Sequence, residues 1–221
     1  MKKILFSLIV TVSVLTFPAI AAETEPESDL DYNPYLVLVN KTHELPSGWE
    51  NVVHIDKVEN SLGEELKIER RTYEAFERLR SDLLEQGVQI ELDSVYRSAD
   101  EQQEIWDAWS ADPELGEEYC KKYLAVPGYS EHHTGLAVDI FLIKDGEQIR
   151  ENDDMIADTE DFAKIHELLP KYGFILRYLE GKEDVTGYAY ERWHLRYIDD
   201  PELATELTSQ GLTLEEYLDA D

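Results

Sequence analysis

A chain of 221 residues with 43% hydrophobic and 10% aromatic residues can form one domain with a packed core, which excludes disorder of the whole chain. Its 49 acidic residues outnumber 20 basic ones, and the formal net charge of −29 repels nucleic-acid phosphates and anionic lipid head groups. We therefore expect no binding to nucleic acid and no stable insertion in a membrane. The single cysteine, Cys120, excludes an intramolecular disulfide framework.

Residues 1–21 have the parts of a secretory signal peptide. Lys2 and Lys3 form a short basic start, an apolar run extends to Phe17, and alanines flank Ile20 as small residues flank a cleavage site. The apolar run is too short to span a bilayer comfortably as a permanent anchor. We therefore predict a secreted protein that works in the periplasm or the cell wall after the signal peptide is cleaved.

The remaining chain divides into an acidic, disordered leader at residues 22–34 and one folded domain at residues 35–221. Helices and strands mix without a regular βαβ rhythm, which favours an α+β domain with a small, mostly antiparallel sheet and flanking helices. The predicted strands cover residues 35–40, 88–96, 136–143, 174–178 and 193–198. The predicted helices cover residues 70–86, 99–109, 114–124 and 159–169, and the stretch after residue 201 is helical in tendency.

Local signals fix two of these helices most clearly. In residues 70–86 apolar side chains recur at spacings of three and four, and Gly87 follows as a C-terminal stop. The second helix has a capping box, with Ser98 as the N-cap and Glu101 three residues later.

Two segments, residues 130–139 and 191–194, concentrate the residues that could carry chemistry. Asp139 lies inside an apolar strand, where a carboxylate is costly unless it is paired or bound to a metal. His132 and His133 precede it, and His194 lies in another apolar strand. Two histidines and one carboxylate suit a three-ligand zinc site with a fourth position open to water. The spacing alone does not decide between His132 and His133.

Glu191 precedes His194 by three residues, an odd spacing that would turn the two side chains to opposite faces of a regular strand. We therefore place Glu191 on a bend that leads into the strand, from which it can reach a water molecule at the zinc.

Together these segments resemble the signature of the VanY-type zinc D-alanyl-D-alanine carboxypeptidases, members of the D-Ala-D-Ala metallopeptidase group. The matching residues are Ser130-x-His132-x-x-Gly135-x-Ala137-x-Asp139, then Glu191-x-Trp193-His194. Further matches are Leu38-Val39-Asn40-Lys41, Leu45-Pro46, Ser94-Val95-Tyr96-Arg97-Ser98, Gln102 and Pro127-Gly128-Tyr129-Ser130. The resemblance spans residues 35–198 and implies the fold that Hedgehog proteins share with D-Ala-D-Ala peptidases.

The resemblance also implies a role for each matched residue. The zinc ligands map to His132, Asp139 and His194, which selects His132 over His133, and the catalytic base maps to Glu191. Arg97 would contact the substrate and stabilise the oxyanion that forms when water attacks the peptide carbonyl. The implied substrate contacts are Ser130, Gln102 and Trp193.

The resulting hypothesis is an exported, monomeric zinc carboxypeptidase that removes the C-terminal D-alanine from peptidoglycan stem peptides. Two alternatives stay open: an L,D-carboxypeptidase that acts on tetrapeptide stems, and a wall-binding module of the same fold without turnover. The presence of Glu191 favours an enzyme, because binding needs only the metal ligands whereas hydrolysis needs a base.

Overall fold

The computed structural model describes residues 33–219 except 114 and 151, and only the backbone of residues 152 and 153. The predicted signal peptide and all but the last two residues of the predicted leader lie outside this part of the chain. Within the described part, no helix is both long and apolar enough to cross a membrane.

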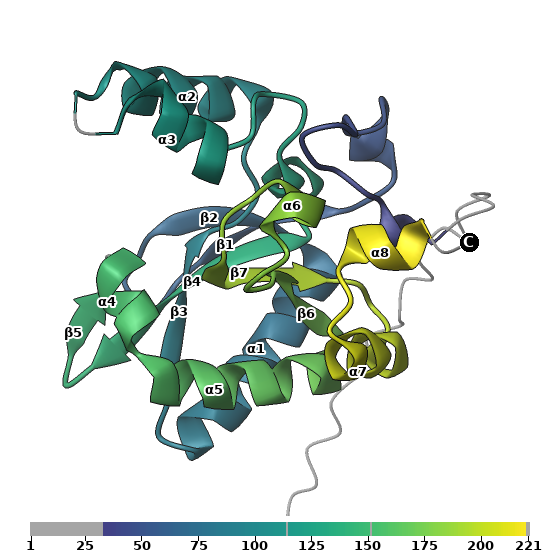
Figure 1. The fold of residues 1–221 in the computed structure, drawn as a ribbon. Helices are drawn as coiled ribbons and strands as arrows, with labels where there is room; N and C mark the ends of the chain where they lie inside the picture. Colours follow the sequence, from purple (N-terminus) through teal and green to yellow (C-terminus); the bar gives the residue numbers. More distant parts are fainter. Residues whose placement is uncertain (1–32, 114, 151, 220–221) are drawn as a thin grey trace, which may run out of the picture.

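A central antiparallel sheet organises the domain (Figure 1). Its strands, in spatial order, are β3 (Gln89–Ser94), β4 (Ala137–Lys144), β7 (Glu191–Tyr197) and β6 (Phe174–Tyr178), with β5 (Glu147–Ile149) paired to the end of β4. A separate hairpin consists of β1 (Ile55–Glu59) and β2 (Glu65–Glu69). The predicted class, an α+β domain with a small antiparallel sheet, is confirmed.

Helices cover both faces of the sheet (Figure 1). On one face lie α1 (Arg70–Glu85) and α5 (Thr159–Leu168), and on the other the hairpin of α2 (Ala99–Ala111) and α3 (Gly116–Tyr123). The shorter helices are α4 (Asn152–Ala157), α6 (Glu183–Thr186), α7 (Pro201–Gln210) and α8 (Leu214–Leu218). Four 3₁₀ turns complete the described chain: η1 (Pro34–Leu36), η2 (Trp49–Asn51), η3 (Glu131–Thr134) and η4 (Leu169–Tyr172).

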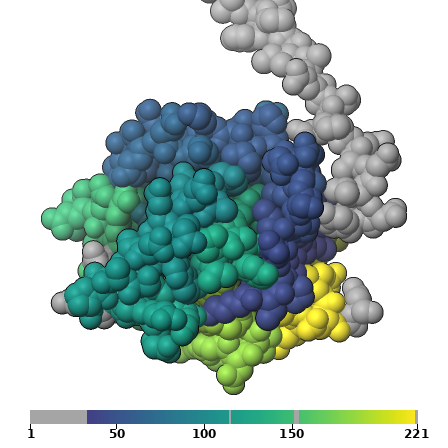
Figure 2. All heavy atoms as spheres, turned by 90° about the horizontal axis from the view of Figure 1, so that it is seen from above, coloured from purple at the N-terminus to yellow at the C-terminus, as the bar shows by residue number. Residues whose placement is uncertain are grey.

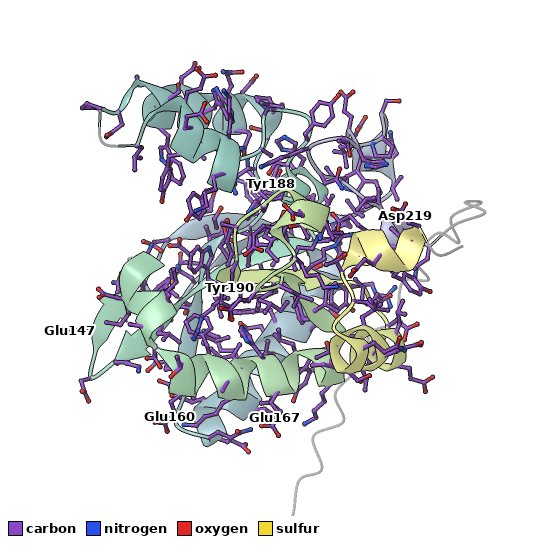
Figure 3. The ribbon with its side chains drawn as sticks, in the orientation of Figure 1. Glu147, Glu160, Glu167, Tyr188, Tyr190 and Asp219 are labelled. Carbon is purple, nitrogen blue, oxygen red and sulfur yellow. The ribbon has the colours of Figure 1, made fainter. Side chains whose placement is uncertain are left out.

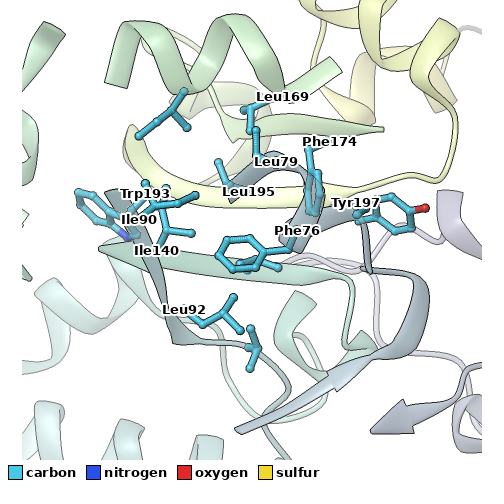
Figure 4. Packing of buried hydrophobic residues seen from close by; sticks show 14 of the residues in the cluster. Phe76, Leu79, Ile90, Leu92, Ile140, Leu169, Phe174, Trp193, Leu195 and Tyr197 are labelled. Carbon is cyan, nitrogen blue, oxygen red and sulfur yellow. The ribbon is translucent and has the colours of Figure 1, made fainter. Parts of the chain in front are cut away.

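The main hydrophobic core lies between the sheet and α1 and α5 (Figure 4). Phe76 and Leu79 of α1 contact a sheet face that includes Leu92, Ile140 and Leu195. Because successive side chains of a strand point to opposite faces, the same alternation that buries Ile140 in this core turns its neighbour Asp139 to the opposite face. The core therefore anchors the strands while their other face carries the polar residues.

Several predicted elements match closely. Helix α1 ends before Gly87, and α2 begins with the capping box of Ser98 and Glu101, in which both reciprocal hydrogen bonds form. Helices α3 and α5 and strands β3, β4, β6 and β7 agree with their predicted ranges to within three residues at each end.

The prediction of a strand at residues 35–40 is wrong. The segment begins as the turn η1, and its single ladder contact is an isolated bridge between Asn40 and His43. The guanidinium of Arg196 takes the place of a neighbouring strand, because its Nη2 donates to the carbonyl oxygens of Tyr35 and Val37. The β1–β2 hairpin was not predicted, because its many charged residues obscure the alternation of the two strands.

Gly135 ends η3 with φ of +76°, in the left-handed region, and its backbone is tightly enclosed. A Cβ there would lie 2.5 Å from Ile55 Cδ1 and 3.1 Å from the backbone nitrogen of Glu69. Gly146 has a similar φ of +83°, but a Cβ there would meet nothing within 4 Å. The two glycines therefore separate the effect of backbone conformation from the effect of close packing.

We predict that Gly135→Ala destabilises the domain more than Gly146→Ala does. Both variants incur about 1–2 kcal/mol for an L-residue in the left-handed region, and only Gly135→Ala adds about 1–3 kcal/mol of overpacking. Urea unfolding of the two proteins measures the difference. Equal losses of unfolding free energy would show that the contacts of Gly135 are unimportant.

Candidate metal centre

Three donor side chains from three different elements meet on the face of the sheet that looks toward α2 and α3. His132 comes from η3, Asp139 from β4 and His194 from β7, and the register of the sheet places Asp139 directly opposite His194. Asp139 Oδ2 is 3.1 Å from His132 Nε2, and its Oδ1 is 2.8 Å from His194 Nδ1. One donor atom from each residue lies within 4.8 Å of the other two. The structure thus brings together the three predicted ligands.

The His132 ring is oriented by the segment that follows β3. Its Nδ1 is 2.7 Å from the carbonyl oxygen of Val95, which can only accept a hydrogen bond, so Nδ1 carries the proton and Nε2 presents a lone pair toward Asp139. Ser130 caps η3, where its Oγ accepts a hydrogen bond from the backbone nitrogen of His132. The predicted role of Ser130 as a substrate contact is thus joined by a structural one.

His133 points elsewhere, and both of its ring nitrogens are occupied. Its Nδ1 lies 2.7 Å from the carbonyl oxygen of Arg97, and its Nε2 accepts a hydrogen bond from the backbone nitrogen of Gly128. These backbone contacts direct His133 away from the cluster, and of the two histidines it is His132 that reaches Asp139.

The buried groups of the cluster shift one another's pKa values. Burial by itself would raise the pKa of Asp139, but the two adjacent imidazoles outweigh that effect and hold the pKa well below its usual range. Burial likewise disfavours protonated His194, yet the Asp139 carboxylate raises the pKa of that imidazole to about 9. Burial and the charge of Arg97 lower the pKa of His132 to about 4. Two imidazole nitrogens and one carboxylate oxygen in this arrangement fit the donor set of a catalytic zinc site.

Glu191 lies beside the cluster, as predicted, but by a different route. It is the first residue of β7 rather than part of a bend before the strand. Leu176 pairs with Leu195 and Tyr178 pairs with Glu191, so three residues of β7 bulge against one of β6. This irregularity leaves Glu191 Oε2 3.9 Å from His194 Nδ1 despite the odd spacing, and burial raises the pKa of Glu191 to about 8.

Arg97 approaches the cluster from the end of β3. Its Nη2 is 3.9 Å from Asp139 Oδ2, and its buried Nε has no hydrogen-bond partner within the part of the chain that the structure describes. The guanidinium retains donors for a further group.

A cleft of about 790 Å³ opens above the three donors. Trp193, Tyr178 and Tyr188 line it near the sheet, and Tyr188 lies on the side that faces α2 and α3 (Figure 3). The α2–α3 hairpin, which spreads across the face shown in Figure 2, lines the cleft with Trp109 and Tyr119. Its wall also includes Ser130, Gln102, Arg97 and Glu191.

Gln102 and Trp193 both reach this cleft. Gln102 is fully buried; its Nε2 donates to the carbonyl oxygen of Ala125, and no described residue donates to its Oε1. Trp193 is 7% exposed and packs in the main core as well as lining the cleft.

Glu131 is a residue of the site that the sequence analysis missed. Its side chain is fully buried, and its Oε2 lies 3.4 Å from His194 Nε2, the nitrogen that points away from Asp139. In the motif Ser130-x-His132, Glu131 occupies the unspecified position, and nothing else in the sequence predicts a role for it.

Two imidazoles and a carboxylate that meet in a cleft, with a glutamate and an arginine beside them, fit the active site of a zinc metallopeptidase. Residues 65–200 match the family model VanY, D-alanyl-D-alanine carboxypeptidase, and the chain belongs to this family. The resemblance that the sequence indicated is confirmed.

Two relatives illustrate the family. The chain is 37% identical over 188 residues to the protein named as carboxypeptidase YodJ of Bacillus subtilis (strain 168), an alignment that covers 83% of this chain and 67% of that protein. It is 36% identical over 189 residues to VanXYC of Enterococcus gallinarum, a bifunctional D-Ala-D-Ala dipeptidase and carboxypeptidase, with 83% and 93% covered.

Solved structures share the fold. A vancomycin resistance D,D-pentapeptidase VanY in complex with Zn(II) matches with a TM-score of 0.69 and 33% identity, over 84% of this chain and 99% of that chain. VanYB in complex with D-alanine-D-alanine matches with the same score and identity, over 85% and 98%. The LD-carboxypeptidase LdcB matches with a TM-score of 0.70 and 37% identity, over 85% and 87%. The prediction of zinc as the cofactor is confirmed by the Zn(II) complex of this family together with the three donors that meet here.

We predict that His132→Ala abolishes stoichiometric metal binding while His133→Ala keeps it. Of these two histidines, His132 directs its Nε2 at Asp139. His133→Ala should instead cost about 1–3 kcal/mol of stability, because it leaves the carbonyl oxygen of Arg97 and the backbone nitrogen of Gly128 without their partner. Elemental analysis of the dialysed proteins and their thermal unfolding measure the two effects. Loss of the metal in folded His133→Ala would overturn the assignment.

Proposed function

We propose that this chain is an exported, monomeric zinc carboxypeptidase that removes the C-terminal D-alanine from peptidoglycan stem peptides, with D-Ala-D-Ala ends as its substrate. His132, Asp139 and His194 would hold the zinc. The observation that carries the proposal is the placement of Glu191 and Arg97 beside these three donors at the base of one cleft.

Zinc bound there would act as a Lewis acid, which polarises the scissile carbonyl and favours deprotonation of water. Glu191 would take the proton of the attacking water on a carboxylate oxygen and deliver it to the leaving amine of D-alanine. The Arg97 guanidinium, which has donors to spare, would stabilise the negative charge that develops on the carbonyl oxygen.

Three further residues would position the peptide. The Oε1 of Gln102 is a buried acceptor without a partner in the described chain, and a backbone N–H of the substrate would satisfy it. Ser130 offers a hydroxyl at the edge of the cluster, and Trp193 forms an apolar wall. A cleft of about 790 Å³ also leaves room for more of the stem than two alanines.

The L,D-carboxypeptidase alternative has its own support. LdcB, named as an LD-carboxypeptidase, shares 37% identity with this chain, a little more than the two VanY structures share. The cleavage of a tetrapeptide stem would use the same zinc, base and arginine, so the choice rests on how the cleft receives the residue before the scissile bond.

Mass spectrometry of stem peptides tests the proposal and decides between the two specificities. The zinc-loaded protein is incubated with a pentapeptide stem that ends in D-Ala-D-Ala and, separately, with the tetrapeptide stem. We expect loss of one alanine from the pentapeptide and no further trimming. Removal of alanine from the tetrapeptide alone would establish the L,D activity, and no cleavage of either by zinc-loaded protein would favour the wall-binding module.

The proposal of export rests on the pattern of residues 1–21, with a basic start, an apolar run and small residues before the cleavage site. Stem peptides of the wall lie outside the cytoplasmic membrane, so export would bring enzyme and substrate together. Mass determination of the protein recovered from culture medium or periplasm would show whether it begins after Ala21.

We predict that Glu191→Gln keeps its zinc and its fold but loses about 10²–10⁴-fold in turnover, because glutamine matches glutamate in shape and cannot accept a proton. Elemental analysis and the rate of D-alanine release are the two measurements. Near wild-type turnover in the zinc-loaded variant would exclude Glu191 as the base.

We predict that Arg97→Ala keeps zinc and lowers the rate by about 10²–10³-fold, since it removes a donor aimed at the developing oxyanion. Arg97→Lys, which keeps the charge but not the forked donors, should recover part of the loss. Unchanged kinetics in Arg97→Ala would exclude a role of Arg97 in stabilising the oxyanion and would leave only its ion pair with Asp139.

A further inference from the structure

Behind the metal cluster lies a buried ionic network that reaches both ends of the folded chain. Glu131 Oε1 accepts hydrogen bonds from Arg177 Nε and from Arg196 Nη1, each at 2.7 Å. The side chains of all three residues are 0% exposed. A carboxylate held this way cannot turn toward solvent, so its second oxygen, Oε2, stays directed at His194 Nε2.

The network continues to helix α8. Arg177 forms a two-point contact with Glu215, Nη1 to Oε2 at 2.8 Å and Nη2 to Oε1 at 2.6 Å. Asn40, near the start of the described chain, donates from Nδ2 to the same Glu215 carboxylate. Two carboxylates and two guanidinium groups balance in charge, so the group tolerates burial as a unit but not the loss of one member.

We propose that Glu131 is the positioning residue of His194 and that α8, through Glu215 and Arg177, holds Glu131 in place. His194 has one ring nitrogen toward Asp139 and the other toward Glu131, so the Glu131 carboxylate fixes both the tautomer and the angle of the ring. The C-terminal helix thereby becomes part of the metal centre although none of its side chains lines the cleft.

This inference rests on the proposed function, because it assumes zinc at His132, Asp139 and His194. The zinc affinity of the wild-type protein separates the two: if wild type binds no zinc, the proposed function fails. If wild type binds zinc and the network variants bind it equally well, the inference fails alone.

The test measures zinc affinity by competition with a chromophoric chelator in two network variants and one control. Glu131→Asp keeps the charge between the arginines but shortens the side chain, so the contact to His194 is lost. Glu215→Gln weakens the hold of α8 on Arg177. The control, Glu216→Gln, alters the next residue of the same helix, whose carboxylate pairs with Lys182 near the surface.

We expect Glu131→Asp to bind zinc about 10- to 100-fold more weakly, the usual effect of removing an outer partner of a metal-bound histidine. Glu215→Gln should show a smaller loss in the same direction, and Glu216→Gln none. The visible absorption of the cobalt-substituted proteins should change in the same order, because it reports the geometry of the ligands.

A purely structural role gives a different pattern. It would lower the melting temperature of Glu131→Asp and Glu215→Gln while the folded proteins kept the wild-type zinc affinity and cobalt spectrum, and that result would overturn the proposal. Equal weakening in Glu216→Gln would also overturn the specific role of Glu215. Should Glu131→Asp fail to fold, Glu215→Gln decides by the same two measurements.

Discussion

The structure depends on one partly buried carboxylate, that of Asp139. Asp139 interrupts an apolar strand, and a lone charge there would cost several kcal/mol if nothing compensated it. The antiparallel pairing of β4 with β7 supplies His194 directly across the strand, and η3 supplies His132 from the loop before it. The need to compensate the charge of Asp139 thus brings three separate elements together.

Much of the fold follows from local patterns. The periodicity of α1 and the capping box of α2 are short-range signals, and both helices form where the residues predict. The failure at residues 35–40 has a long-range cause, since the backbone there is satisfied by the Arg196 side chain and not by a neighbouring strand. An apolar run can show that a segment is buried, but it cannot show which donor will reach its carbonyl oxygens.

The candidate site divides in the same way. Asp139 and His194 could be found because a carboxylate and an imidazole in apolar strands are conspicuous, whereas the resemblance to a known family selected His132 and gave Glu191 its role. Glu131 could not, because its role depends on arginines 46 and 65 residues farther along the chain. The orientation of Glu191 follows from a bulge in β7. The three-residue spacing of Glu191 and His194 indicated an irregular strand but not the bulge itself. Sequence patterns thus identify candidate metal ligands and catalytic residues more readily than the residues that orient them.

The buried ionic network also joins the first and last elements of the described part of the chain to the sheet. Arg196 donates to the backbone oxygens of Tyr35 and Val37, and Glu215 joins Asn40 to Arg177 in the sheet. Buried ion pairs contribute little net stability compared with well-packed apolar groups, but they accept few alternative partners. Their value here is geometric: the same guanidinium groups that tie both ends of the domain to the sheet also fix the carboxylate behind His194. On the proposed role of Glu131, a change in the contacts of Asn40 or Glu215 would therefore reach the orientation of His194 through Arg177.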